Sequence, residues 1–513
     1  DTSTQNLQAL TVSPDGGSYW TIIDTYTFPA YDDTAVYDES AVTDEFANGV
    51  GTIDATAEAE TTEETPAEEA TTEEAPAEDT AAAEPEEEES LYTVLTDEDG
   101  NVYDLGGMEI IVRDWWSGDP AEPTNDYEEA REEYRDWIQE TYNFTIKEQA
   151  ISDWTSAPAD FTEYATTGGD ENYIFVVRDD PAITNAMTQG LMYDLSTLDC
   201  LDFNQPKFQK NKLHEQYTKG NSIYAMFAGD SEPRTGVYFN KRLLTEAGID
   251  PESLYELQAN HEWTWDKFTE LMDTVQRDID NDGVIDVYGV TQNSGNMISA
   301  AVWSNGGEYV GQKDGKYVYR LEDPETVEGL TWAVETVLAK YTLPYPDGAE
   351  WDYYKEAYKS GMAAFMVDDA YCAGDFLSEM EDDFGFVAFP MGPQSSEYTN
   401  CWSNNPHVIP ACYDADKAWK IAFAWNLYTD DVPGYEDYEG WKAGYYSKFR
   451  DTEAVDQTLE IMVNNGMITY DGIIPEMQRG SDFIWGLNAN TVVSEAIDSV
   501  SEYWKGLVDA ANG

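Results

Sequence analysis

From Gly107 onward, apolar residues alternate between short strand-length runs and longer stretches with helical spacing. Met108–Val112 is a compact apolar run, and Tyr127–Thr141 places its large apolar side chains on one helical face. Phe144–Gln149 and Tyr173–Val177 have the length and composition of further strands. Strands separated by helices of this length predict an α/β fold around a mostly parallel sheet.

The same alternation continues through the second half of the chain. The stretch TGVYFNKRLLTEAGID (235–250) predicts a strand ending at Asn240 and a helix opening at Lys241. Residues 326–339 and 414–428 have the spacing of amphipathic helices, and 384–393 reads as a strand followed by a turn.

The first 106 residues have a different character. In residues 91–106, apolar and polar residues alternate on both sides of a DEDGN turn, which predicts a short hairpin. Residues 51–90 hold two near-identical decapeptides and 16 acidic residues with no basic residue, which predicts an acidic disordered tether. Residues 1–50 include SYWTIIDTYTF (18–28), which has strand character, but their role stays open.

Charge excludes some classes of partner. The chain carries 103 acidic and 27 basic residues, and 74 of the acidic residues lie beyond residue 106. Such a surface repels nucleic acid and anionic membranes. It keeps an exported protein soluble, and it leaves neutral and cationic ligands possible.

Motifs for catalysis and for organic cofactors are missing from the sequence. The chain has three histidines and no GxSxG, HExxH, Walker or GxGxxG motif, so we expect a protein that is not an enzyme and binds no organic cofactor. A pair of carboxylates could still serve a glycosidase, but no single acid stands out. The four cysteines, Cys200, Cys372, Cys401 and Cys412, form no CxxC pattern, and either a Cys401–Cys412 bridge or free thiols is open.

The order of the blocks between Gly220 and Tyr428 resembles a known family. It runs strand, Tyr-x-Asn-Lys, amphipathic helix, "AGID", and then "TW" opening a helix at 263–267, followed by EAYKSGMAAFMVDDAY (356–371) and FGFVAFPMGP (384–393). This order resembles the family 1 extracellular solute-binding proteins, the maltose-binding-protein type that feeds ABC importers. The resemblance covers about 107–513 and leaves residues 1–106 outside it.

The resemblance implies a two-lobed, periplasmic-binding-protein-like fold of type II, with hinged lobes built on central mixed sheets. We expect lobe 1 to comprise 107–231 and 409–465, and lobe 2 to comprise 232–408 and 466–513. Crossovers between the lobes are then expected near 231–236, 405–409 and 466–480. The family also implies a monomer at the cell surface, held by a lipid anchor that this sequence does not show, which loads a membrane permease of an ABC transporter.

Candidate ligand residues follow strands or lie near the expected crossovers. Open α/β sheets place ligands beyond the carboxyl ends of their strands, and a sugar stacks on aromatic rings while carboxylates and guanidinium groups take its hydroxyls. On these grounds and by the resemblance, the expected ligand-binding residues are Trp115, Trp116, Arg178, Asp179, Asp180, Glu232, Arg234, Trp303, Asp369, Tyr371, Trp402 and Trp485. An oligosaccharide is the expected ligand; a cationic solute or peptide, and a surface glycan-binding role without a transporter, are the alternatives.

A second candidate site is a calcium loop. Asp278, Asp280, Asp282 and Asp286 take the spacing of a calcium-binding loop around Gly283, and Val284 is included among the expected ligands. The twelfth position of that spacing is Gly289, which supplies no bidentate carboxylate. The sequence therefore predicts a structural calcium ion, with an acidic turn between a helix and a strand as the alternative.

Overall fold

The computed structural model describes residues 4–12 and 18–27 by their backbone alone, and 91–513 except 121, 179, 403, 404 and 437. The chain divides into two compact units, Asp1–Glu86 and Glu87–Gly513. In the first unit, β1 (Thr4–Val12) and β2 (Ser18–Thr27) form an antiparallel pair with a register shift at Leu7/Gln8. The strand character expected at 18–28 is confirmed over β2, whereas the acidic tract 51–90 lies outside the described residues.

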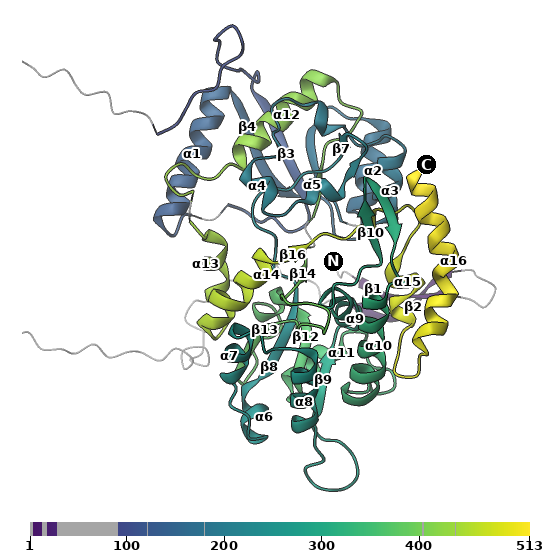
Figure 1. The fold of residues 1–513 in the computed structure, drawn as a ribbon. Helices are drawn as coiled ribbons and strands as arrows, with labels where there is room; N and C mark the ends of the chain where they lie inside the picture. Colours follow the sequence, from purple (N-terminus) through teal and green to yellow (C-terminus); the bar gives the residue numbers. More distant parts are fainter. Residues whose placement is uncertain are drawn as a thin grey trace, which may run out of the picture. The chain divides into compact units, whose positions relative to one another are not determined.

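The second unit contains a first four-stranded sheet in the order β15-β5-β3-β4 (Figure 1). Strand β3 (Met108–Asp114) pairs in parallel with both β4 (Phe144–Ala150) and β5 (Asn172–Val176), while β15 (His407–Val408) joins antiparallel. Helix α1 (Asp126–Tyr142) connects β3 to β4 and buries Tyr134 and Ile138 against them. The sheet is further covered by α2 (Ala157–Thr167), α3 (Pro181–Thr188) and α12 (Ala415–Tyr428).

A second four-stranded sheet has the order β13-β8-β12-β9. Here β8 (Thr235–Asn240) runs antiparallel to β13 (Phe384–Ala388) and β12 (Ala363–Asp369), and β12 pairs in parallel with β9 (Tyr288–Gln292). Both sheets are therefore mixed, as the family resemblance implied. The mostly parallel pairing predicted from the alternation of strands and helices is found in the first sheet, whereas the second sheet is mostly antiparallel. Around the second sheet lie α6 (Lys241–Glu246), α7 (Ser253–Ala259), α8 (Trp265–Val275), α9 (Ser294–Trp303), α10 (Pro324–Thr331), a π-helical stretch (Trp332–Tyr341), α11 (Tyr353–Lys359) and α16 (Val493–Asn512).

Local signals explain where these elements begin and end. The side chain of Asn240 accepts a hydrogen bond from Leu243 N at 3.0 Å, which caps α6 directly after the buried strand β8. Helix α1 ends at Asn143, whose φ of 55° is a left-handed conformation that asparagine tolerates. The hairpin expected at 91–106 is reduced to one antiparallel bridge between Thr96 and Val102 around its turn.

The chain crosses between the two sheets at several points. Two crossing segments lie side by side, because β14 (Asn400–Cys401) pairs in parallel with β16 (Gly466–Met467). A further crossing, between Tyr428 and Gly440, was not expected from the sequence. Beyond it, α13 (Gly440–Tyr446), a π-helical turn (Ala454–Leu459) and α14 (Glu460–Asn464) bury Val455, Leu459 and Met462 in the core that covers the second sheet.

Residues 440–464 therefore pack with the second sheet, although the sequence grouped them with the first. Amphipathic helices reveal which face they bury, but not which of two similar sheets covers that face.

The remaining short elements are a 3-10 turn (Leu195–Thr197), α4 (Pro206–Gln209), α5 (Leu213–Gln216), β6 (Thr218–Lys219), β7 (Ser222–Ile223), β10 (Val310–Lys313), β11 (Lys316–Tyr319), and turns or short helices at Ala370–Ala373, Asp471–Ile473, α15 (Arg479–Asp482) and Ile484–Gly486.

Candidate functional site

Both sheets present the carboxyl ends of their central strands to the crossings. Strand β8 begins at Thr235, directly after one crossing, and Thr235 pairs antiparallel with Asp369 at the end of β12. Strand β15 begins at His407, directly after a second crossing, and His407 pairs antiparallel with Val176 at the end of β5. The residues that follow β3, β5 and β12 therefore lie where open sheets of this kind bind ligands.

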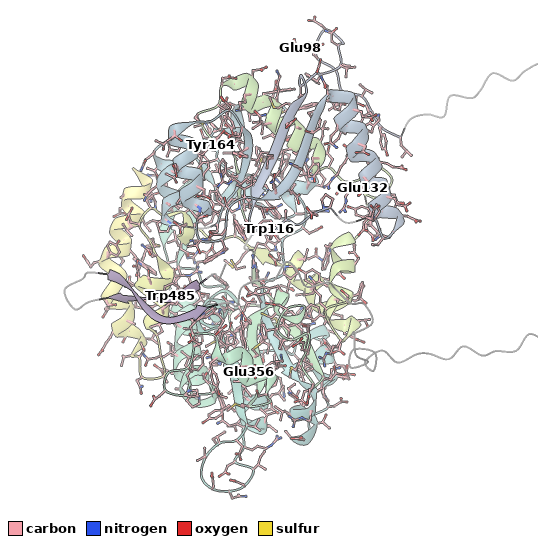
Figure 2. The ribbon with its side chains drawn as sticks, turned by 180° about the vertical axis from the view of Figure 1, so that it is seen from behind. Glu98, Trp116, Glu132, Tyr164, Glu356 and Trp485 are labelled. Carbon is pink, nitrogen blue, oxygen red and sulfur yellow. The ribbon has the colours of Figure 1, made fainter. Side chains whose placement is uncertain are left out.

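The loop after β3 displays two tryptophans. The buried carboxylate of Asp114 accepts hydrogen bonds from the backbone N–H groups of Trp116 at 3.2 Å and Ser117 at 3.1 Å, which holds the turn. The Trp116 side chain is 53% exposed, and its ring meets that of Trp115 edge-on with centroids 4.9 Å apart. Trp116 lies at the end of the first sheet that faces the second (Figure 2).

The loop after β5 forms a second group on the same edge. The guanidinium carbon of Arg178 lies 4.2 Å from the ring centroid of Trp154, and Arg178 forms an ion pair with Asp180 at 3.0 Å. Asp180 also caps α3 by accepting a hydrogen bond from Ala182 N. Asp179 lies outside the described residues. Sequence reasoning missed Trp154, although it follows β4 closely and the rule applied to the neighbouring strands would have found it.

The second sheet supplies a polar cluster around Asp369. Arg234 forms an ion pair with Glu232 at 2.9 Å and lies 3.9 Å from Asp369. The Asp369 carboxylate also accepts hydrogen bonds from Thr235 Oγ1 at 2.9 Å and from Asn296 Nδ2 at 3.1 Å. Burial, and then the neighbouring Asp368, raise the pKa of Asp369 to about 6. Asn296 was missed from the sequence, although it sits at the start of α9, directly beyond the carboxyl end of β9.

The buried carboxylate of Asp368 lies beside this cluster and is hydrogen-bonded to it through Asn296. It is 1% exposed and accepts hydrogen bonds from Tyr354 Oη at 2.8 Å and Asn296 Nδ2 at 3.1 Å. Next to the cluster, Tyr371 is 40% exposed. Trp485 is 75% exposed and lies close to Gly295 at the start of α9. The structure thus brings together most of the ligand residues expected from the second lobe.

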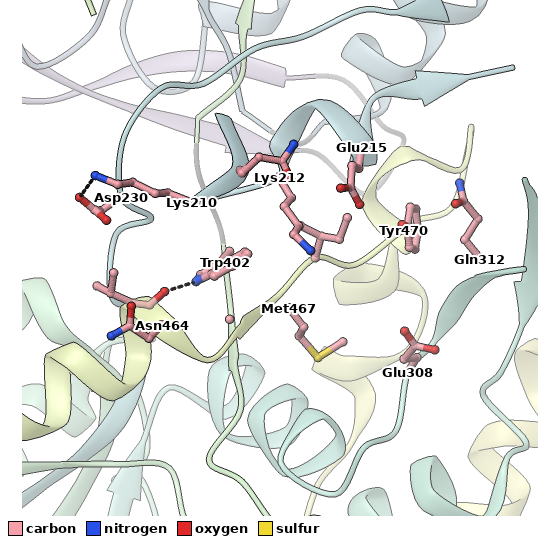
Figure 3. A pocket seen from close by; sticks show the side chains of 14 residues that line it. Lys210, Lys212, Glu215, Asp230, Glu308, Gln312, Trp402, Asn464, Met467 and Tyr470 are labelled. Atoms are coloured by element: carbon pink, nitrogen blue, oxygen red, sulfur yellow. Dashed lines mark hydrogen bonds and ion pairs between the residues drawn. The ribbon is translucent and has the colours of Figure 1, made fainter. Parts of the chain in front are cut away.

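Two expected ligand residues lie elsewhere. Trp303 is 7% exposed in the core of the second lobe, and the guanidinium of Arg479 lies over its ring, 5.2 Å from the centroid. It is therefore a core residue at the end of α9, and its inclusion among the expected ligand residues is corrected. Trp402 donates a hydrogen bond from Nε1 to Val463 O at 3.1 Å and lines a pocket of about 670 Å³ at the crossings, which we call the hinge pocket (Figure 3). The hinge pocket is also lined by Lys210, Lys212, Glu215, Glu308, Met467 and Tyr470.

The expected calcium loop folds as a tight acidic turn. Carboxylate oxygens of Asp278, Asp280 and Asp286 all lie within 4.8 Å of one another, which suits a hard cation that takes oxygen ligands. The carboxylate of Asp282 instead accepts a hydrogen bond from Val284 N at 2.7 Å. Three of the four expected carboxylates fit such an ion, and calcium binding stays a prediction.

None of the helices among the described residues combines the length and apolar character needed to cross a bilayer. Among these residues, all four cysteines are free thiols, so the Cys401–Cys412 bridge left open by the sequence is not formed.

Comparisons with known proteins agree with this architecture. Residues 202–425 match the family model described as bacterial extracellular solute-binding protein. A search of curated proteins gives no significant match. Among solved structures, the chain is similar to UgpB from Mycobacterium tuberculosis in complex with glycerophosphocholine, at 14% identity and a TM-score of 0.53, covering 74% of this chain and 95% of that one. It is also similar to the cyclic alpha-maltosyl-1,6-maltose binding protein from Arthrobacter globiformis, at 15% identity and a TM-score of 0.51, covering 80% and 100%.

At these identities the structural similarities speak for the fold alone. They confirm the periplasmic-binding-protein-like fold that the sequence predicted, with two sheet-centred lobes. The strand-end residues described above lie within that fold, and the family match covers the whole second sheet. Residues 202–425 are therefore similar to the bacterial extracellular solute-binding protein family, the family that the order of the sequence blocks resembles.

Proposed function

We propose that this protein captures a carbohydrate, most simply an oligosaccharide, between its two sheet-centred lobes and delivers it to the membrane permease of an ABC transporter. The observation that carries the proposal is the position of the strand-end groups. Exposed aromatic rings of Trp116, Trp154 and Tyr371 accompany hydrogen-bonding carboxylate and guanidinium groups at the carboxyl ends of strands in both sheets, and the exposed ring of Trp485 lies near the start of α9.

The chemistry of these groups suits a sugar. The C–H face of a sugar ring stacks on an indole or phenol, and its hydroxyls can donate to carboxylates such as Asp369 while accepting from Arg234. The guanidinium of Arg178 lies over one face of the Trp154 ring, and both Trp154 and Trp116 remain more than half exposed as aromatic surface of the first lobe. The maltosyl-maltose binding protein among the structural relatives is consistent with a carbohydrate ligand.

Release and delivery would depend on the crossings. A ligand that contacts both lobes favours the state in which they are closed, because only that state makes both sets of contacts. The proposal places the protein outside the cell, acting as a monomer at a membrane-anchored position, with ATP hydrolysis carried out by another subunit of the transporter.

A cationic solute is the second candidate, and Asp369 supports it. Asp368 and Asp369 are adjacent and Glu232 lies nearby, while Arg234 is the basic group that faces them. A cation that displaced Arg234 would find three carboxylates within one cluster.

Calorimetric titration tests the two candidates directly. The panel comprises neutral oligosaccharides of α- and β-linked glucose, xylose and mannose, together with spermidine and a basic tripeptide. We expect one oligosaccharide to bind with 1:1 stoichiometry, and Asp369→Ala to weaken it. Binding of the cations alone would select the second candidate, and binding of nothing in the panel or turnover of a glycan would refute sugar capture.

A further inference from the structure

A pocket apart from the strand-end site contains two arginines that form no ion pair with any carboxylate among the described residues. Arg131 and Arg135 lie one turn apart on α1 and line a pocket of about 740 Å³ that we call the arginine pocket. The other walls come from the crossing that follows α12, from Gly229 and Asp230, and from α13. None of the expected ligand residues lines it.

These arginines differ from the rest in how their charge is balanced. Every other arginine among the described residues forms an ion pair with a carboxylate within 4 Å. No such pair is found for Arg131 or Arg135 within the described ranges, and the Nε atoms of both are buried without a hydrogen-bond partner. In a chain with 103 acidic and 27 basic residues, two adjacent unpaired guanidinium groups are unexpected by chance.

Several described carboxylates near the pocket already have other partners. Glu128 accepts hydrogen bonds from Thr124 N at 2.7 Å and Thr124 Oγ1 at 2.8 Å at the start of the helix. Asp430 pairs with Lys207 at 2.6 Å, and Asp230 pairs with Lys210 at 3.6 Å. Asp431 also lines the pocket and is exposed, and Glu148 lies close enough to interact with Arg135 electrostatically without forming an ion pair.

Aromatic rings hold the guanidinium groups in place. The guanidinium carbon of Arg135 lies 3.6 Å from the ring centroid of Tyr428, and Nη2 donates a weak hydrogen bond to Tyr428 O at 3.4 Å. Arg131 lies 5.6 Å over the ring of Tyr127. Burial, and then repulsion from Arg131, lower the pKa of Arg135, and the charge of a bound anion would offset both costs.

We propose that the arginine pocket is a second ligand site, which binds the oxyanion of a small carboxylate or phosphate compound through Arg131 and Arg135. A planar guanidinium matches a carboxylate or phosphate with two parallel N–H···O bonds, and both arginines line the pocket. The volume accommodates a hydroxylated acid such as a hexuronate, and Tyr438 and Trp441 offer rings to its carbon skeleton. Because α1 covers the first sheet and α13 packs with the second, the bound anion would contact elements of both lobes.

The test is a calorimetric titration of the full chain with inorganic phosphate, sulfate, glucuronate and neutral glucose. We expect at least one oxyanion to bind with 1:1 stoichiometry, glucose to be silent, and affinity to fall as salt rises. Binding of phosphate or sulfate would show that the oxyanion alone suffices, whereas binding of glucuronate alone would show that the carbon skeleton is needed. Silence of all three oxyanions at millimolar concentration would overturn the proposal.

Variants locate the binding. Arg131→Gln and Arg135→Gln should each weaken the oxyanion at least tenfold, while the matched control Arg242→Gln, whose side chain pairs with Asp382 and Glu246 elsewhere, should leave it within about twofold. Affinity that is unchanged in the Arg131→Gln, Arg135→Gln double variant would overturn the proposal. Binding of a neutral oligosaccharide should be the same in all of these variants, so failure here is separable from failure of sugar capture.

A measurement on the unaltered protein covers the case of variants that do not fold. Phenylglyoxal modifies accessible arginines, and peptide mass mapping reports each site. The oxyanion that binds should protect Arg131 and Arg135 but not Arg242, and equal modification of all three with and without the oxyanion would contradict the proposal.

Discussion

Replacing Trp116 by alanine separates ligand binding from stability. The side chain is 53% exposed and touches Trp115 edge-on, so its removal leaves the core of the first lobe intact. We expect the free energy of unfolding to fall by less than ~1 kcal/mol, as for other exposed positions. Trp115 is partly buried against that core, so Trp115→Ala should cost more stability and is the less specific probe.

The expected loss of binding follows from the area of the ring. One face of an indole covers roughly 80–100 Å², and at ~25 cal/mol per Å² a stacked sugar would gain about 2 kcal/mol from it. That energy corresponds to a Kd about 30-fold higher in Trp116→Ala. Calorimetry with the oligosaccharide that binds the unaltered protein measures this ratio.

A matched control is available in the second lobe. Trp351 is 72% exposed and lies beside α11, where Lys355 Nζ lies 5.8 Å from its ring centroid. Trp351→Ala should leave Kd within about twofold. Equal affinities of Trp116→Ala and the unaltered protein, or equal losses in both variants, would refute the assignment of Trp116 to the sugar site.

Three further predictions concern the surroundings of the site. If the Asp278 loop binds calcium, EDTA should lower the melting temperature and Asp278→Asn should abolish that shift, whereas an unchanged melt would leave the loop as a plain turn. Tyr354→Phe removes the hydrogen bond to buried Asp368 and should cost about 1.5–3 kcal/mol in urea unfolding; a loss below ~0.5 kcal/mol would contradict this. Burial lowers the pKa of His407 to about 4, whereas in the unfolded chain its pKa is about 6.5. As pH falls from 6.5 towards 4, the unfolded chain binds a proton at His407 that the folded protein does not, so the free energy of unfolding falls. In His407→Gln, the free energy of unfolding measured with urea should change less between these pH values than in the unaltered protein. An unaltered pH dependence would contradict that reasoning.

The sequence predicted the sheet-forming elements of the second unit closely. Residues 108–112, 127–141 and 144–149 became β3, α1 and β4 with boundaries shifted by at most two residues, because their apolar spacing has one clear period. The helix expected at 326–339 is present, although it turns π-helical from Trp332.

Long-range packing was less predictable. Residues 440–464 pack with the second sheet, and no local pattern indicates which sheet an amphipathic helix will cover. Trp303 reads as a possible ligand residue because tryptophan is common in sugar sites, yet it fills the core under Arg479. Asn296 and Trp154 were missed because each lies on a loop or helix start whose proximity to the site depends on strand order.

That Arg131 and Arg135 form no ion pair within the described ranges could not have been predicted from the sequence. Acidic residues surround Arg131 and Arg135 along the chain, and pairing at helical spacing would have been the natural expectation. Only the structure shows that Glu128 serves the helix start and that Asp430 serves Lys207.

Hydrogen exchange with and without the bound oligosaccharide tests the central claim most directly. Capture between the lobes predicts slower amide exchange in both sets of strand-end loops, 114–118 and 178–182 from the first lobe together with 231–236, 294–297 and 369–373 from the second. Protection confined to one lobe, or protection of the hinge pocket with none in these loops, would contradict the account.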